Sequence, residues 1–173
     1  NFILSKAEKI DIIINNAGLA HGSLFQMLSQ EKLYELFSIN FFSQVQFTQL
    51  LIRNMIKNKS GSIVNIGSTS GLIGDRGTVG YGSSKAAFMY ASKAMASELG
   101  RYNIRVNSIS PRLTKTDLMY SNTKENILLS EIEKISLKRI ADTDEISKVV
   151  LFLASEHSSY INGQNLIVDG GRL

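Results

Sequence analysis

Three side chains between residues 68 and 85 have types and spacing suited to acid–base chemistry. Tyr81 and Lys85 stand four residues apart at the start of a long helical pattern, so their side chains are expected on one face of a helix. A phenol ordinarily has a pKa of about 10. A nearby ammonium favours the phenolate, so we expect Lys85 to lower the pKa of Tyr81 by roughly 1 to 3 units if the site is partly dry. Tyr81 would then donate and accept a proton near neutral pH.

Ser68 is the third of these side chains. It follows the apolar, β-branched run of Ile63, Val64 and Ile66, which predicts a buried strand, and a glycine-rich loop leads on to Tyr81. A serine fixed at a strand end can hydrogen-bond the oxygen of a carbonyl or alcohol that lies against the phenol. The residues therefore predict a site that polarises a single C–O bond.

The order S-x12-Y-x3-K, spread over a strand, a glycine-rich loop and a helix, resembles the short-chain dehydrogenase/reductase family. The resemblance is closest to its 3-oxoacyl-[acyl-carrier-protein] reductases and extends over essentially all 173 residues, including K-R-I-A-D-T-D-E-I at 138–146 and I-N-G-Q-N-L-I-V-D-G-G at 161–171. It implies an α/β fold with a Rossmann-like, doubly wound parallel sheet. It also implies reversible hydride transfer between a nicotinamide cofactor and a carbonyl or secondary alcohol.

The resemblance gives each of the central residues a role. Tyr81 donates the proton, Ser68 positions the oxygen, and Lys85 lowers the pKa of Tyr81 and holds the nicotinamide ribose, so that Tyr81 and Lys85 are both catalytic and cofactor-binding. Asn40, within F-S-I-N-F-F-S-Q, matches a helix asparagine that holds a kink and a water linking Lys85 to solvent. From the residues alone, Asn40 would cap a mid-helix break equally well.

Two further segments resemble cofactor-binding motifs. The apolar run at 10–14 predicts a buried parallel strand and ends in N-N-A-G, where the resemblance makes Asn15 stabilise the sheet and places Ala17 and Gly18 against the adenosine side of the cofactor. A simple strand-to-loop turn explains the same residues, and both can hold. Residues 104–109 predict the next strand, which is followed by S-P-R-L-T-K-T.

In that second segment Pro111 fixes a turn, and the resemblance places the backbone of Thr114 at the nicotinamide carboxamide and Thr116 near the pyrophosphate. The family has Pro-Gly where this chain has Pro111-Arg112. The long side chain of Arg112 could contact a phosphate, turn to solvent or obstruct the nicotinamide ring, and the sequence leaves these three possibilities open.

The family's first βαβ unit, with its glycine-rich T-G-x-x-x-G-x-G turn, has no counterpart in these residues. We therefore expect residues 1–173 to form a single short-chain dehydrogenase/reductase domain that lacks the N-terminal nucleotide-binding unit. On this interpretation the source protein is roughly 70 to 80 residues longer, and residues 12–14 present an open, apolar sheet edge. The resemblance to the 3-oxoacyl reductases makes NADP the expected cofactor. NAD stays open as the alternative, because the residue that selects between the two belongs to the absent unit.

Residues 117–136 are predicted to form a mobile polar loop and helix over the site, where the family varies most and selects its substrate. Leu118, Met119, Leu128 and Leu129 would line an acyl channel or pack into the core. Acidic residues at 142–145 predict the start of another helix, and the segment ending in V-D-G-G resembles the family's last strand.

Composition limits the possible partners. The chain has 43% hydrophobic residues, no cysteine and two histidines far apart, which predicts a soluble, cytoplasmic protein without disulfides or a metal site. Its net charge of +4 comes from scattered residues, which suits a phosphorylated cofactor or an acyl carrier protein and argues against nucleic acid. The helices at 29–58 and 81–99 resemble the family's subunit-pairing face, so a homodimer or homotetramer is expected.

The leading hypothesis is reduction of a small-molecule or acyl-carrier-bound 3-oxoacyl thioester with NADPH. A sugar or other small-alcohol dehydrogenase is the alternative within the family. A catalytically inactive assembly or binding module is the alternative of another class, and it is supported by the missing phosphate-binding turn and by Arg112.

Overall fold

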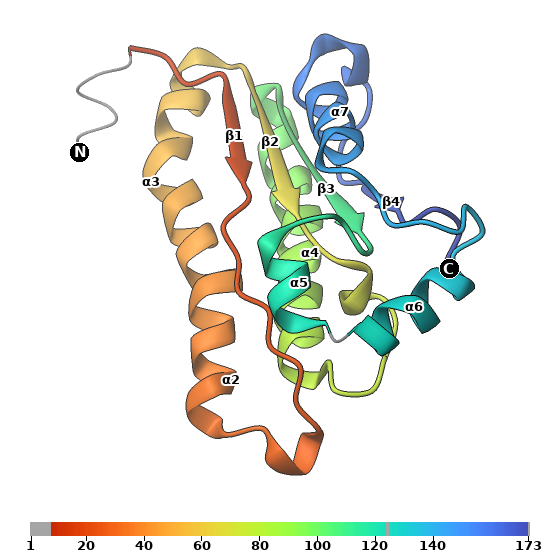
Figure 1. Ribbon diagram of the computed structural model, residues 1–173. Coiled ribbons are helices and arrows are strands. Elements are labelled where there is room, and N and C mark those ends of the chain that lie inside the picture. The colour runs from red at the N-terminus through yellow and green to blue at the C-terminus, as the bar shows by residue number, and fades with distance from the viewer. Residues whose placement is uncertain (1–7, 124, 173) are drawn as a thin grey trace.

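The computed structural model describes residues 8–123 and 125–172. Its centre is a sheet of four parallel strands in the order β1-β2-β3-β4, with helices packed against it (Figure 1). The strands are Ile12–Asn15, Gly61–Ile66, Ile104–Pro111 and Asn165–Val168. The Rossmann-like α/β architecture predicted from the sequence is thereby confirmed.

The helices follow the predicted order. They are α2 (Gln30–Phe37), α3 (Ser43–Asn58), α4 (Val79–Leu99), α5 (Asp117–Asn122), α6 (Glu125–Lys134) and α7 (Thr143–Ala154). A π-helical turn, η2 (Ser38–Phe42), joins α2 to α3. Single 3₁₀ turns are η1 (Phe25–Met27), η3 (Thr69–Gly71), η4 (Gly100–Tyr102) and η5 (Glu156–Ser158).

Local signals in the sequence fix the helix ends. The Ser29 hydroxyl caps α2 by accepting a hydrogen bond from the Lys32 amide, and α3 ends at Lys59, which adopts the left-handed conformation with φ 49°. The predicted helix start at 142–145 is confirmed, because Asp142 and Glu145 form a capping box at α7.

The core lies on both faces of the sheet. On one face, Leu51 and Met55 of α3 and Ala96 of α4 pack with Ile63 and Val106. On the other face, Leu153 of α7 packs with Val64 and Ile109. Adjacent strand residues thus face opposite layers, as a sheet buried on both sides requires.

β1 forms one edge of the described sheet. Ile13 and Asn15 are buried, whereas Ile12 and Ile14 are each 48% exposed, so the apolar edge expected there is present. In the described part of the chain, no helix is long and apolar enough to cross a membrane.

Candidate active site

The carboxyl ends of β1, β2 and β3 meet at one edge of the sheet and open into a cavity of about 810 Å³. This is the edge at which open parallel sheets bind their ligands. The cavity is lined by Gly18 after β1, by Ser68 after β2 and by Tyr81 and Lys85 from α4. The structure therefore brings together the three residues expected to do the chemistry.

Ser68 and Tyr81 form the polar centre of the cavity. Ser68 is 7% exposed at the end of β2, and its hydroxyl caps η3 by accepting a hydrogen bond from the Ser70 amide at 3.2 Å. Burial raises the pKa of the Tyr81 phenol, and a hydrogen bond with the Ser68 side chain partly opposes this effect. The Tyr81 phenol consequently keeps its proton at neutral pH.

Lys85 corrects the expectation of an acidified tyrosine. Its ammonium is buried, and Nζ donates a hydrogen bond to the Ile66 carbonyl at 2.8 Å. Burial lowers the pKa of Lys85 to about 8. The predicted lowering of the Tyr81 pKa by Lys85 is not found, because loss of hydration disfavours the charged forms of both groups.

Two glycines that the motif analysis did not single out, Gly71 and Gly82, let the turn formed by Ser68 and η3 pack closely against α4. This turn is called the serine turn below. A β-carbon at Gly82 would lie 2.4 Å from the Ser70 carbonyl oxygen, and one at Gly71 would lie 2.8 Å from the Ala86 amide nitrogen. The sequence did contain a signal for Gly82: together with Gly80 it flanks Tyr81 inside a helical pattern. A glycine within a helix usually marks a place where another segment packs closely. Gly71 and Gly82 set the approach of Ser68 to Tyr81.

Gly82→Ala should therefore impair catalysis although alanine is the better helix former. Alanine ordinarily gains about 1 kcal/mol in a helix interior, but here the serine turn must move away from α4. We expect kcat to fall about tenfold or more and the free energy of unfolding to fall by roughly 1 to 3 kcal/mol. Steady-state kinetics and urea denaturation measure the two effects.

Gly74→Ala is the matched control, because a β-carbon at Gly74 would meet no atom within 4 Å. Both parameters should stay close to wild type in that variant. A Gly82→Ala protein with wild-type kcat would show that the close packing does not position Ser68.

Asn40 lies in the π-helical turn between α2 and α3 and is fully buried. Its Nδ2 donates to the Leu19 carbonyl at 2.8 Å and to the Ser84 hydroxyl at 2.9 Å, and its Oδ1 accepts from the Leu19 amide at 2.8 Å. Asn40 thus fastens the segment after β1 to α4 beside Lys85. π-Helical turns inside α-helices occur frequently at functional sites, and a relay role for Asn40 stays a prediction.

The N-N-A-G segment divides between the core and the cavity. The Asn15 side chain donates to Thr48 at 2.9 Å and to Asn65 at 2.8 Å, inside the sheet layer and away from the cavity. The Ala17 carbonyl accepts from Gln44, and Ala17 does not line the cavity. Asn16, which the motif analysis passed over, lines the cavity together with Gly18.

Gly18 and the segment after β3 offer surfaces that suit a nicotinamide cofactor. A β-carbon at Gly18 would lie 3.4 Å from both Lys85 Nζ and Asn40 Oδ1, so the Gly18 backbone runs beside these two side chains. Pro111, Thr114 and Thr116 all line the cavity. The Thr116 hydroxyl also caps α5 by accepting from the Met119 amide at 3.2 Å.

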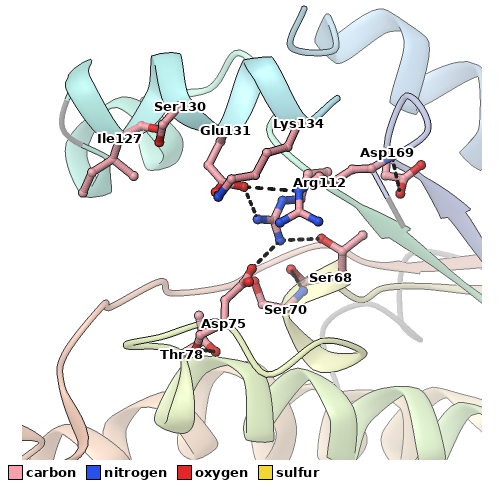
Figure 2. Close-up of polar contacts among 12 residues, drawn as sticks. Ser68, Ser70, Asp75, Thr78, Arg112, Ile127, Ser130, Glu131, Lys134 and Asp169 are labelled. Atoms are coloured by element: carbon pink, nitrogen blue, oxygen red, sulfur yellow. Dashed lines mark hydrogen bonds and ion pairs between the residues drawn. The ribbon is translucent and has the colours of Figure 1, made fainter. Parts of the chain in front are cut away.

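Arg112 does not turn to solvent. Its side chain is 10% exposed and forms ion pairs with Asp75 at 2.8 Å and with Glu131 at 2.5 Å. Figure 2 shows the guanidinium between these two carboxylates, which come from the loop after Ser68 and from α6. The sequence motifs identified neither partner.

Only some of the residues expected to line an acyl channel lie at the cavity. Leu118 and Met119 line the cavity, whereas Leu128 and Leu129 do not, and Leu129 is 59% exposed. Three apolar residues that the sequence did not single out complete this wall of the cavity, namely Leu113, Ile127 and Ile146.

Comparison with known proteins identifies the family. A family model described as "Enoyl-(Acyl carrier protein) reductase" matches residues 1–172. The chain is 40% identical over 168 residues to 3-oxoacyl-[acyl-carrier-protein] reductase FabG of Chlamydia trachomatis, a match covering 97% of this chain and 67% of that protein. It is 36% identical over 163 residues to an acetoacetyl-CoA reductase of an Acinetobacter species, covering 94% and 65% of the two chains.

Solved structures have the same fold. A structure described as ElxO with NADP bound superposes with a TM-score of 0.92 at 27% identity, covering 99% of this chain and 71% of that one. A gluconate 5-dehydrogenase from Burkholderia cenocepacia, in complex with NADP and tartrate, gives a TM-score of 0.91 at 28% identity, covering 95% and 65%. With the sequence relatives, the fold and the convergence of Ser68, Tyr81 and Lys85 on one cavity, the chain belongs to the short-chain dehydrogenase/reductase family of oxidoreductases.

Proposed function

We propose that the protein containing this chain reduces a 3-oxoacyl thioester, most simply one carried by an acyl carrier protein, with NADPH as the hydride donor. The observation that carries the proposal is the placement of Ser68, Tyr81 and Lys85 around one cavity with an apolar wall. The 40% identity to a 3-oxoacyl-[acyl-carrier-protein] reductase and the NADP in the two similar structures support the substrate and the cofactor.

In the proposed chemistry, the side chains act on the oxygen of the carbonyl group and the cofactor acts on its carbon. The Ser68 hydroxyl donates a hydrogen bond to the carbonyl oxygen and fixes it beside the Tyr81 phenol. As negative charge develops on that oxygen, Tyr81 transfers its proton to it and the alcohol forms. When bound, the nicotinamide cofactor supplies the hydride to the carbonyl carbon.

The raised pKa of Tyr81 fits this direction of reaction. A phenol that stays protonated at neutral pH is ready to act as an acid, whereas alcohol oxidation requires the phenolate as base.

The Lys85 ammonium would stabilise the phenolate left after proton transfer and hold the nicotinamide ribose. Pro111 and Thr114 would hold the rest of the nicotinamide end, and Thr116 would lie near the pyrophosphate. Gly18, expected on the adenosine side, lies beside Lys85 and would contact the nicotinamide end instead. Asn40 would complete the proton relay from Lys85, and Asn15 and Ala17 would support the adenosine side from behind.

A small-alcohol dehydrogenase remains the second candidate, because one similar structure is a gluconate 5-dehydrogenase with tartrate bound. The cavity wall favours the thioester, since Leu113, Leu118, Met119 and Ile127 offer an acyl chain an apolar surface and a polyol no hydrogen bonds.

The test is a substrate comparison on the complete protein. Acetoacetyl-CoA and an acetoacetyl-acyl carrier protein would be assayed with NADPH and NADH, and gluconate with NADP⁺. We expect kcat/KM for the thioesters with NADPH to exceed the other combinations at least about tenfold. Preference for gluconate would favour the second candidate. A folded protein that neither binds NADPH nor reduces any carbonyl would be the inactive assembly module.

We also propose that the protein acts as a homodimer or homotetramer. Phe47 and Leu50 of α3 and Tyr90 of α4 are between 39% and 76% exposed, and an apolar face of this kind favours pairing of two copies. Sedimentation of the complete protein measures the assembly directly.

A further inference from the structure

An ion bridge of partly buried side chains links two segments that line the cavity. Arg112 Nη1 pairs with Asp75 Oδ2 at 2.8 Å and Nη2 with Glu131 Oε2 at 2.5 Å, while Lys134 Nζ pairs with Glu131 Oε1 at 2.5 Å. Arg172 Nε lies 3.5 Å from Glu131 Oε2. Figure 2 shows Arg112 in the middle of this group, with Asp75 on one side and Glu131 on the other.

Glu131 and Arg112 both stay charged across the physiological range. Burial alone would raise the pKa of Glu131, but hydrogen bonds from Lys134 and Arg112, together with their charges, lower this pKa to about 2. The carboxylates of Asp75 and Glu131 raise the pKa of Arg112 further, although burial opposes them. Without the guanidinium, both carboxylates would lose the cation that lies between them.

The two ends of the bridge belong to segments that form opposite walls of the cavity. Asp75 lies in the loop that continues from Ser68 and η3, and Glu131 lies on α6. Arg112 adds a longer contact, at 3.4 Å, to the hydroxyl of Thr69, the residue next to Ser68. Arg112 itself is anchored, because its backbone amide donates to the Val168 carbonyl of β4 at 3.1 Å.

Along its own length, α6 makes few apolar contacts with the core. None of its ten residues is buried, so it has no apolar side chain enclosed in the core. Its Ile127 nevertheless lines the cavity, although the side chain is 50% exposed. Ile135, directly after the helix, is 2% exposed and anchors its C-terminal end. The rest of the helix, Ile127 included, is held by polar contacts, of which the pair with Arg112 is among the least exposed.

We propose that Arg112 is a positioning residue for the substrate: it fastens α6 to the loop that carries Ser68 and so fixes the width of the substrate side of the cavity. The inference rests on the proposed function for its kinetic consequence, but the coupling between Arg112 and α6 follows from the ion pairs alone. Among the described residues, the Arg112 side chain bonds to Thr69, Asp75 and Glu131 and not to Tyr81 or Lys85. It therefore acts through the wall it holds and takes no part in proton transfer.

Arg112→Gln in the complete protein is the main test. We expect KM for acetoacetyl-CoA to rise about tenfold, with kcat within about threefold of wild type and the Kd for NADPH unchanged. Amide hydrogen exchange over residues 125–134 should quicken in the same variant. Arg112→Lys, which can keep one of the two pairs, should recover part of the loss in KM.

Glu131→Gln removes the other partner and should shift KM and exchange in the same direction. Because both substitutions break one contact, the double variant should be less impaired than the two single effects combined. Lys148→Gln is the control: it removes an exposed pair with Asp144 on α7 and should change neither readout.

Wild-type KM and wild-type exchange in both Arg112→Gln and Glu131→Gln would overturn the inference. So would an equal loss of kcat in Arg112→Gln and Arg112→Lys, which would place the guanidinium in the chemical step. If the wild-type protein fails to reduce the thioester, the proposed function fails. Amide exchange then decides the inference alone: quickened exchange over 125–134 in Arg112→Gln supports it, and unchanged exchange overturns it.

Discussion

Tyr81→Phe should lower kcat for thioester reduction by roughly 10² to 10⁴-fold, the range that a positioned general acid contributes. Phenylalanine keeps the ring and its packing but has no proton to give to the carbonyl oxygen. NADPH binding should fall by less than about tenfold, since Gly18, Lys85 and Thr114 still line the cavity. Single-turnover kinetics with NADPH fluorescence separates the two effects.

Tyr90→Phe is the matched control for this variant. Tyr90 lies on the same helix but is 76% exposed, outside the cavity, so its kcat should equal that of wild type. If Tyr81→Phe retained full turnover, another group would have to be the proton donor, and the assignment of Tyr81 would be wrong.

The raised pKa of Tyr81 adds a pH signature to the same prediction. Reduction uses the protonated phenol and should be insensitive to pH through the neutral range, whereas oxidation of the corresponding 3-hydroxyacyl thioester should accelerate as pH rises. The acceleration should disappear in Tyr81→Phe. Reduction that slows steadily between pH 6 and pH 8 would indicate a phenol with a lowered pKa instead.

The site positions were predictable where they depend on local spacing. A strand end, a glycine-rich loop and two residues one helical turn apart are encoded within 18 residues, so the convergence of Ser68, Tyr81 and Lys85 followed from short-range geometry. At Asn40 the family resemblance implied a kink, and the residues alone allowed a cap at a mid-helix break. The structure has a π-helical turn there, through which the helix continues.

The electrostatics of the site were not predictable from spacing. The direction of the Tyr81 pKa depends on how much water reaches the phenol, and that depends on segments after β1, β2 and β3 that are distant in sequence. The motif gave the distance between Tyr81 and Lys85 along the helix but not their burial. Burial decided the result, because it disfavours phenolate and ammonium alike.

The ion-pair partners of Arg112 could not be predicted from the sequence either. Arg112 was the residue on which the sequence left three possibilities open, and its partners are 37 residues before it and 19 residues after it in the chain. Each is one of 15 acidic residues, and nothing in the neighbourhood of Asp75 or Glu131 distinguishes it from the others. Only the fold shows that the loop after β2 and helix α6 face each other across the end of β3.

Lys85→Met should abolish turnover and at the same time stabilise the protein at neutral pH. The pKa of Lys85 falls from 10.5 to about 8 on folding, which corresponds to a cost of roughly 3 kcal/mol for keeping the ammonium charged in the native state. Methionine fills similar volume without a charge. It forfeits the hydrogen bond to the Ile66 carbonyl, worth about 1 kcal/mol, so a net gain of roughly 2 kcal/mol is expected at pH 7.

The stabilisation should depend on pH with a definite sign. Between about pH 8 and pH 10.5 the native wild-type protein binds fewer protons at Lys85 than the unfolded chain does, so its free energy of unfolding rises with pH across that window. The cost is therefore fully present below about pH 8 and gone above 10.5. The difference between Lys85→Met and wild type should shrink over the same interval and reverse sign at its upper end, where only the lost hydrogen bond remains.

Urea denaturation of the complete protein at pH 7, 9 and 10.5 measures this difference, and comparing variants cancels the titration of other groups. Lys93→Met serves as control, because Lys93 lies exposed on the same helix and its removal should leave the difference small at every pH. A Lys85→Met protein less stable than wild type at pH 7 would mean that the ammonium stabilises the native state. The cavity would then be more hydrated than its burial indicates, and a stable phenolate at Tyr81 would again be possible.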